Sequence, residues 1–376
     1  MVADLSGTPL PPLTAIPPDL ATLADYERRA PAHLPPAHWA HIAEGAGEGV
    51  SLADNRRAFD RWRLLPRALA DLRGGGTAVA LPGGTHTAPL LVAPLAYMRL
   101  AHPEGELAAV RAATAMGLGF VLSTLASATI EEVAAARADA VRQLGRAPAP
   151  LWFQLYLQPR REDSLALVRR AEAAGYEALV LTIDAGLKRT GFTLPGGVEA
   201  ANLRGVTPVR QTARAGEQLL FGTPLVEALP RWDDLAWLRA ETRLPLIVKG
   251  MVVGEDLDRL VDAGVDALVL SNHGGRVLDG LPAALDVLPM VRARVGDRLP
   301  LLLDGGVRSG ADAATALCLG ARAVLVGRPV LHGLAVAGLA GAAHVLSLLR
   351  IEFEAAMVQL GCAGPEELTA DRLLRV

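Results

Sequence analysis

The sequence predicts an α/β protein built as a TIM (β/α)8 barrel with an N-terminal helical extension. Eight short apolar runs recur along the chain, helical patterns separate them, and nearly all of the runs are apolar on both faces. Parallel strands buried between a core and a layer of helices have this two-sided apolar character. The predicted strands are residues 87–94, 119–124, 151–156, 178–184, 245–250, 267–272, 299–306 and 323–328. Eight units of strand and helix are the number that closes such a barrel.

The segments between the runs carry the helical patterns that a barrel requires. Examples are EGELAAVRAATAMG, TIEEVAAARADAVRQLG, DSLALVRRAEAAG, GEDLDRLVDAG and SGADAATALCLG, several of which end in the glycine expected just past a helix. The competing fold is a doubly wound parallel sheet, which usually has fewer units and a GxGxxG motif after its first strand. The first run is not followed by that motif, so the pattern favours the barrel.

The first 65 residues do not continue the strand-helix repeat. We expect residues 1–65 to form an arm and helices that pack on a barrel made by residues 66–376, as one structural domain. The opening MVADLSGTPLPPLTAIPPDL lacks a basic start followed by an apolar run, so no export signal is expected. The apolar stretch from Val330 to Leu349 contains two histidines and several glycines, and we predict a buried helix there rather than a membrane span.

Charge and cysteine content exclude several classes of protein. The 376 residues include 37 basic and 40 acidic side chains, a formal net charge of −3, which gives no general field for nucleic acid. Cys318 and Cys362 lie far apart without a Cys/His cluster, so neither a disulfide framework nor a metal site is indicated. A reducing cytoplasmic location is the expectation.

Polar side chains at the carboxyl ends of the predicted strands define the candidate site, because catalytic groups of this fold lie there. An apolar strand that ends in Lys, His or Asp places a costly group near the core, which packing explains poorly. The polar side chains at these ends are Ser123, Thr124, Gln154, Tyr156, Thr182, Asp184, Lys249, Ser271, Asn272, His273, Arg276, Asp304, Arg308 and Arg328.

The last two units predict an anion site. They read DGGVRSG and VGRP, so both place glycines beside an arginine ahead of a helix. Exposed backbone N–H groups, a helix N-terminus and guanidinium groups bind phosphate, and this part of a barrel is a frequent phosphate site. The alternative is that these glycines only form tight turns and the arginines are surface charges.

The motif SNHGGRVLDG after the sixth strand suggests a base beside a carboxylate-binding group. His273 is a natural proton acceptor near neutral pH, and Arg276 can grip a carboxylate bidentately. Asp184, two strands away, could orient His273, and Tyr156 could hydrogen-bond the substrate or simply form the pocket wall. Lys249 has two interpretations, a Schiff base or a charge against an electron-rich cofactor, and the phosphate site favours the second.

Taken in order, these motifs resemble those of the FMN-dependent α-hydroxy acid oxidase/dehydrogenase family, which includes glycolate oxidase, lactate oxidase and mandelate dehydrogenase. The similarity runs from LPPAHWAHIAEGAG through APLAYMRLAHPEGE, WFQLY, LTID and LPLIVKG to SNHGGRVLDG, DGGVRSG and VGRP. The resemblance implies FMN as cofactor, His273 as base with Asp184 as its partner, Arg276 as carboxylate clamp, and Tyr156 as active-site tyrosine. It implies FMN contacts from Pro94, Leu95, Ala96, Ser123, Gln154, Thr182, Lys249, Ser271, Asp304, Gly305, Gly306, Arg308, Gly327 and Arg328.

Two departures mark a divergent member. His41 stands where the family usually has an active-site tyrosine, and the segment IDAGLKRTGFTLPGG lacks the arginine-rich stretch that follows the aspartate in the family. Lys188 or Arg189 is a candidate replacement for the missing arginine; otherwise carboxylate binding rests on Arg276 alone. Leu125 and Tyr97 are expected to reshape the substrate pocket.

The resemblance implies oxidation of an (S)-2-hydroxy acid to a 2-oxo acid, with His273 as base and hydride transfer to flavin N5, or a carbanion route through the same histidine. Oxygen or another electron acceptor would reoxidise the flavin, and a homo-oligomer, often a tetramer, is expected. One alternative is that the altered carboxylate site redirects the scaffold to an amine or alcohol of a specialised pathway. Two others are a non-enzymatic flavin-binding protein and a barrel enzyme that uses Lys249 as a Schiff base.

Overall fold

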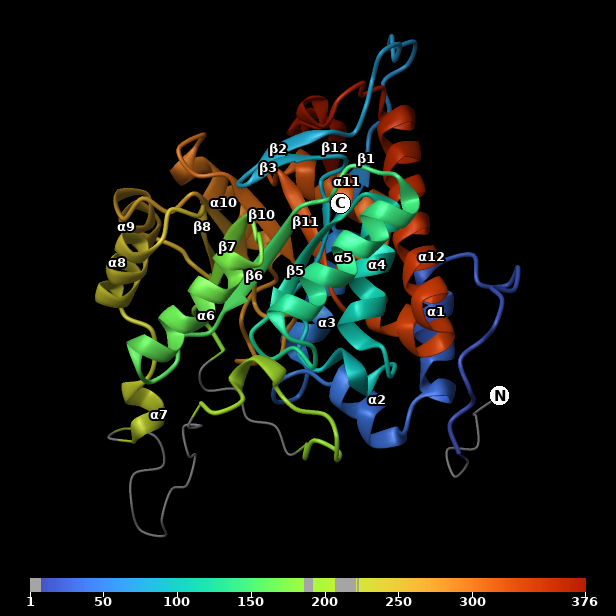
Figure 1. The fold of residues 1–376 in the computed structure, drawn as a ribbon. Coiled ribbons are helices and arrows are strands. Elements are labelled where there is room, and N and C mark those ends of the chain that lie inside the picture. Colours follow the sequence, from blue (N-terminus) through green and yellow to red (C-terminus); the bar gives the residue numbers. More distant parts are fainter. Residues whose placement is uncertain (1–7, 186–191, 207–220, 222) are drawn as a thin grey trace.

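The protein is a closed barrel of eight parallel strands, as the sequence predicts (Figure 1). The computed structural model describes residues 8–185, 192–206, 221 and 223–376. Each strand lies within one of the predicted runs, and consecutive strands pair in parallel until the last pairs with the first. The barrel strands are β4 (Leu90–Val92), β5 (Gly119–Ser123), β6 (Leu151–Leu155), β7 (Ala178–Thr182), β8 (Leu246–Gly250), β9 (Ala267–Leu270), β10 (Leu301–Asp304) and β11 (Ala323–Val326).

A ring of helices covers the outside of the barrel (Figure 1). Thr129 begins α5 with a reciprocal capping box to Glu132, and Gly145 ends that helix in the left-handed conformation, as the sequence signals require. The helices of the ring are α4 (Gly105–Met116), α5 (Ile130–Leu144), α6 (Arg161–Ala173), α8 (Trp232–Glu241), α9 (Asp256–Asp262), α10 (Ala284–Val295), α11 (Gly310–Cys318) and α12 (Arg328–Leu360). Short helical segments in the connections are η2 (Met98–Leu100), η3 (Ala201–Leu203), α7 (Pro224–Glu227), η4 (Pro365–Glu367) and η5 (Ala370–Arg372).

Alternate residues of each strand enter two separate apolar clusters. Leu91, Val121 and Trp152 point into the barrel, whereas Leu90 and Phe120 join the larger cluster between strands and helices. Both faces of every barrel strand are therefore buried, which explains why the runs show no polar alternation.

A hairpin covers one end of the barrel and leaves the other for chemistry. Strands β2 (Val79–Leu81) and β3 (Gly84–His86) pair antiparallel, and Leu81 belongs to the inner barrel cluster. The His86 ring meets Trp152 edge to face, with ring centroids 5.4 Å apart. The hairpin lies opposite α2 and α3, so the carboxyl ends of the strands face the N-terminal helices (Figure 1).

The N-terminal extension consists of α1 (Leu23–Arg29), η1 (Ala30–His33), α2 (Pro36–Ala43) and α3 (Val50–Asp60). Helix α1 packs on α12, where the Tyr26 hydroxyl lies 2.9 Å from His344 Nδ1. Helix α3 is fixed to the barrel by a reciprocal amide pair, in which Asn55 and Asn272 donate to each other at 2.9 and 3.0 Å. After α3, strand β1 (Trp62–Leu64) pairs antiparallel with β12 (Leu373–Arg375).

Helix α12 is long and apolar enough to cross a membrane by length and composition alone. Its most apolar 18-residue window is 56% buried inside the structure, where the helix packs on α1, α4 and α11. Ala337 and Gly338 depart from helical backbone angles, so two helical pieces meet at a kink. This packing is that of a core helix on the outside of the barrel.

Replacing Trp152 by alanine tests the inner barrel layer. The side chain is fully buried, so Trp152→Ala should lower the free energy of unfolding by about 3–5 kcal/mol through lost burial and a cavity. Denaturant unfolding of the two proteins measures this difference. Met290→Ala, at a position that is 59% exposed, should change the free energy by less than about 0.5 kcal/mol. Equal effects of the two substitutions would contradict the layer assignment.

Candidate active site

A cavity of about 510 Å³ opens at the carboxyl ends of the strands. Most of the residues predicted from strand ends and from the resemblance line it together. These are His41, Pro94, Leu95, Ala96, Tyr97, Ser123, Leu125, Tyr156, Thr182, Lys249, His273, Arg276, Asp304, Gly305, Gly306, Arg308, Gly327 and Arg328. Gln154, Ser271 and Asp184 stand behind this lining, hydrogen-bonded to Ser123, Lys249 and His273 respectively. Lys188 and Arg189 fall outside the described residues.

His273 is held between a carboxylate and a phenol. Its Nδ1 lies 2.9 Å from Asp184 Oδ1, and its Nε2 lies 3.5 Å from the Tyr156 hydroxyl. The His273 backbone has φ of +58°, a left-handed conformation that costs energy for a residue with a Cβ, and its N–H donates to Ser271 Oγ at 2.9 Å. This strained backbone conformation at His273 turns the ring toward Asp184 and the cavity.

Burial and the charge of Lys249 keep the His273 ring neutral near pH 7. Burial lowers the pKa of His273 below its ordinary 6.5, the charge of Lys249 lowers it further, and the Asp184 carboxylate offsets only part of this. Burial acts to raise the pKa of Asp184, but the hydrogen bond from His273 and the charge of Lys249 outweigh it, so this pKa lies below its usual range. A neutral imidazole that donates from Nδ1 to a carboxylate leaves Nε2 as a proton acceptor.

Lys249 is a charged side chain that is buried. Its Nζ donates to Ser271 Oγ at 2.8 Å and lies 3.0 Å from Asp304 Oδ2. Burial acts to lower its pKa, but the carboxylates of Asp304 and Asp184 outweigh that effect and raise the pKa above its ordinary value. A Schiff base needs the neutral amine, so this environment disfavours that interpretation.

Buried polar atoms without partners mark the wall where a heterocyclic cofactor fits. Within the described part of the chain, Gln154 Nε2, Thr182 Oγ1 and Asp304 Oδ1 have no hydrogen-bond partner. Unpaired buried donors and acceptors are costly, so a ligand that carries ring nitrogens and hydroxyls would relieve them. The donor set fits the ring and ribityl chain of FMN.

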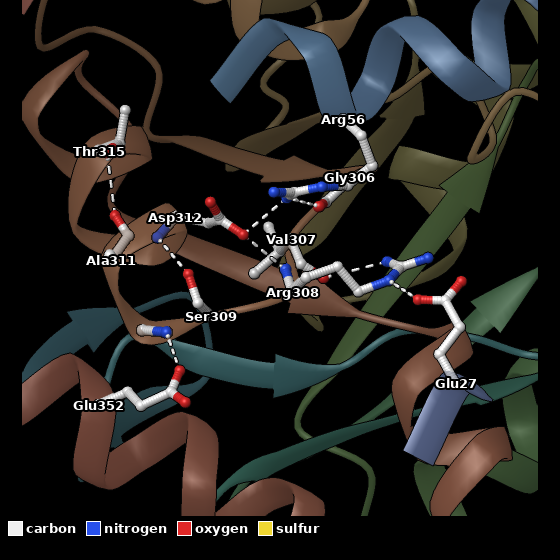
Figure 2. Close-up of polar contacts among 11 residues, drawn as sticks. Glu27, Arg56, Gly306, Val307, Arg308, Ser309, Ala311, Asp312, Thr315 and Glu352 are labelled. Carbon is white, nitrogen blue, oxygen red and sulfur yellow. Dashed lines mark hydrogen bonds and ion pairs between the residues drawn. The ribbon is translucent and has the colours of Figure 1, made fainter. Parts of the chain in front are cut away.

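The loop after β10 forms the anion end of the cavity, and side chains from three helices hold it (Figure 2). Asp312 Oδ2 accepts the Arg308 backbone N–H at 2.8 Å and an Arg56 N–H at 2.7 Å. Arg308 Nε donates to Glu27 at 3.1 Å. Gly306 has φ of +82°, and a Cβ there would lie 2.1 Å from the Asn55 carbonyl oxygen, so only glycine fits this turn.

Positive charge gathers at this end without full compensation. Arg328 donates to the carbonyls of Ile42 at 2.9 Å and of Gly274 at 3.0 Å. Burial, reinforced by the charges of Arg276 and Arg308, lowers the pKa of Arg328 to about 9. The guanidinium groups of Arg308 and Arg328, which both line this end of the cavity, fit the phosphate of FMN.

Arg276 and His41 meet at the mouth of the cavity. Arg276 donates from Nη2 to the His41 carbonyl at 2.8 Å and from Nη1 to the Glu44 carbonyl at 2.9 Å, so it also holds the end of α2. The His41 ring stacks on Phe192, with centroids 4.4 Å apart and planes at 24°.

Several residues of the site were missed by sequence reasoning. Glu27, Arg56 and Asp312 hold the loop after β10, and Asn55 holds Asn272. Asn272 itself, inside the SNHGG motif, is among the strand-end residues that the sequence singles out. Asp312 lies four residues after Arg308, within the helical pattern SGADAATALCLG, whereas Glu27, Asn55 and Arg56 come from the N-terminal extension and carry no motif.

The fold and this site define a barrel oxidoreductase that holds a phosphate-bearing flavin. Residues 30–375 match the family described as FMN-dependent dehydrogenase, and the chain belongs to that family. The predicted family and cofactor are thereby confirmed.

Relatives and solved structures agree over nearly the whole chain. It is 49% identical to an L-lactate oxidase of Alicycliphilus denitrificans, over 96% of this chain and 98% of the relative. It is 38% identical to human 2-hydroxyacid oxidase 1, over 92% and 94% of the two chains. The crystal structure of a mandelate oxidase with benzoyl-formic acid superposes with a TM-score of 0.82 at 39% identity, covering 95% of this chain and 98% of the other. The protein is an FMN-dependent 2-hydroxy acid oxidase or dehydrogenase.

Substitution of Gly306 tests the anion end. Gly306→Ala should weaken FMN retention, because the loop must move away from Asn55 and a positive φ strains an alanine by about 1–3 kcal/mol. The flavin-to-protein ratio after gel filtration measures retention. Gly175→Ala is a matched control, since φ there is +78° and a Cβ would meet nothing within 4 Å. Normal retention by Gly306→Ala would contradict this account of the loop.

Proposed function

We propose that the protein oxidises an (S)-2-hydroxy acid to the corresponding 2-oxo acid, with His273 as the base that takes the hydroxyl proton. The observation that carries this proposal is the geometry of His273, whose Nδ1 is fixed by Asp184 while Nε2 faces Tyr156 in the cavity. An oriented neutral imidazole of this kind is the usual form of a general base. Bound FMN supplies the two-electron acceptor for the hydrogen on the substrate carbon.

The residues that would hold FMN fall into two groups. Ser123, Gln154 and Thr182 present polar atoms at the carboxyl ends of β5, β6 and β7, where the flavin ring would lie. Arg308 and Arg328 would bind the phosphate. Lys249, charged and buried, would stabilise negative charge that develops on the ring.

Carboxylate binding would rest on Arg276 and Tyr156. Both line the cavity together with His273, and a bidentate guanidinium matches a carboxylate. Burial raises the pKa of Tyr156 well above its ordinary value, with the Asp184 charge adding to the effect, so the phenol keeps its proton and can donate. His41 would present an imidazole where the family has a phenol.

Relatives favour a short aliphatic substrate. Beside the L-lactate oxidase at 49% identity, an L-lactate oxidase of Nostoc is 43% identical over 92% of this chain. We therefore propose L-lactate as the first substrate to test and oxygen as the first acceptor. Apolar walls from Leu125 and Leu157, and the likeness to mandelate oxidase, favour an aromatic 2-hydroxy acid as the second candidate.

Anaerobic mixing tests the substrate proposal. The FMN-loaded protein is mixed with each enantiomer of lactate and of mandelate, and with glycolate, while the visible flavin band is recorded. We expect (S)-lactate to bleach the band and air to restore it. Bleaching by the (R) enantiomers alone, or by none of the acids, would overturn the proposal. His273→Ala should keep its flavin colour but lose the bleaching.

The pH profile tests the state of His273. The active form is the neutral ring, so kcat/KM should fall as the pH drops through the pKa of His273, which lies below 6.5. Asp184→Asn removes a charge that raises this pKa, so the acid limb should move to still lower pH. The same variant should lose roughly 10²- to 10⁴-fold in kcat, because the ring is no longer oriented. An acid limb that moves upward in Asp184→Asn would contradict the assignment.

A further inference from the structure

A second cavity of about 410 Å³ adjoins the anion end of the active site. Gly306, Arg308 and Arg328 line both cavities, so the proposed phosphate position lies at their junction. The lining of the second cavity also includes residues of the N-terminal helices, among them Glu27 of α1 and Trp39 of α2. The N-terminal extension therefore reaches the group that would bind the cofactor phosphate.

The Glu27 carboxylate forms an ion pair with the Arg308 guanidinium. Its Oε2 accepts from Arg308 Nε at 3.1 Å, and Figure 2 shows this carboxylate against the guanidinium. Arg308 Nη1 donates to the Val307 carbonyl at 3.1 Å. Each edge of the Arg308 guanidinium that could hold an anion bidentately, Nε with Nη2 or Nη1 with Nη2, thus already has one nitrogen engaged, the first by Glu27 and the second by Val307.

Charge balance explains why a carboxylate stands there. Arg276 and Arg308 both repel the Arg328 guanidinium, and Glu27 is an acidic side chain that acts against this repulsion. Asp304, a second acidic group that acts on Arg328, is already paired with Lys249. Without a bound anion, Glu27 stabilises the cluster; with a phosphate dianion present, the same carboxylate repels the ligand.

We propose that Glu27 is an internal competitor of the cofactor phosphate, which displaces it from Arg308 when FMN binds. This inference rests on the proposed phosphate role of Arg308. The carboxylate lowers the affinity for FMN and stabilises the cofactor-free protein, so the N-terminal extension sets how tightly FMN is held.

The displaced side chain has a place to go. The Glu27 side chain is 43% exposed and borders the second cavity, so a change of rotamer meets little packing. His332 lines the same cavity, is 1% exposed, and has no hydrogen-bond partner at either ring nitrogen within the described residues. Burial lowers the pKa of His332 to about 3, so its ring is neutral and can donate one N–H to a carboxylate that moves away from Arg308.

Flavin binding to the cofactor-free protein tests the proposal. Glu27→Gln keeps an oxygen acceptor for Arg308 and removes the charge, and Glu27→Ala removes both. Each variant is titrated into FMN and into riboflavin, which lacks the phosphate, and the quenching of flavin fluorescence gives the dissociation constant. Both variants should bind FMN roughly three- to tenfold more tightly than the wild type and riboflavin equally. The tightening should shrink at high salt, because salt screens repulsion at a partly exposed site.

Two control variants distinguish failure of this inference from failure of the proposed phosphate site. Glu48→Gln removes a carboxylate that lines the same cavity and shows no ion pair within the described structure, so FMN binding should not change. Arg308→Gln should weaken FMN but not riboflavin; equal binding of FMN by Arg308→Gln and wild type would overturn the phosphate site and with it this proposal. If Arg308→Gln behaves as expected while Glu27→Gln and Glu27→Ala bind FMN equally or more weakly than wild type, Glu27 supports Arg308 and the competitor role is wrong.

Thermal unfolding gives an independent readout. Loss of the Glu27 charge should lower the Tm of the cofactor-free protein, because the arginine cluster loses a counter-charge. The rise in Tm on adding saturating FMN should be larger in Glu27→Gln than in the wild type, since binding to the native state adds its free energy to stability. An equal or smaller rise would contradict competition.

Discussion

Burial of positive charge at the carboxyl ends of the strands is the constraint on which this site depends. Lys249, Arg276, Arg308 and Arg328 all line one cavity, and a buried cation is tolerated only where it is paired and hydrogen-bonded. Lys249 meets this requirement through Asp304 and Ser271. The arginines meet it through backbone carbonyls and Glu27, which leaves a positive field at the end where a phosphate would bind.

The same charges set the state of the base. Lys249 and burial hold His273 neutral, while Asp184 stays ionised because His273 and Lys249 both favour the carboxylate. One lysine therefore acts on both members of the pair and keeps both unprotonated, the histidine as a neutral ring and the aspartate as a carboxylate. A proton acceptor and its orienting group follow from that arrangement.

The barrel supplies chemical groups, and the N-terminal extension fixes their positions. Carbonyls at the end of α2 receive Arg276 and Arg328, Asn55 of α3 holds Asn272 and closes over Gly306, and Glu27 of α1 reaches Arg308. None of these contacts involves residues close in sequence. The extension thus forms part of the site although it contributes no strand to the barrel.

The sequence by itself determined the eight strands, because a strand buried on both faces is a continuous run of apolar residues, which a surface segment does not show. It also determined which polar residues follow those strands, and SNHGG, DGGVRSG and VGRP identified the site from local spacing. Only the tertiary structure decided that Asp184 reaches His273 across two strands, that Lys249 is charged, and that Glu27, Arg56 and Asp312 hold the anion loop. The physical reason is that periodicity and turn chemistry act over a few residues, whereas charge pairing and desolvation depend on groups that approach one another only when the chain has closed into a barrel.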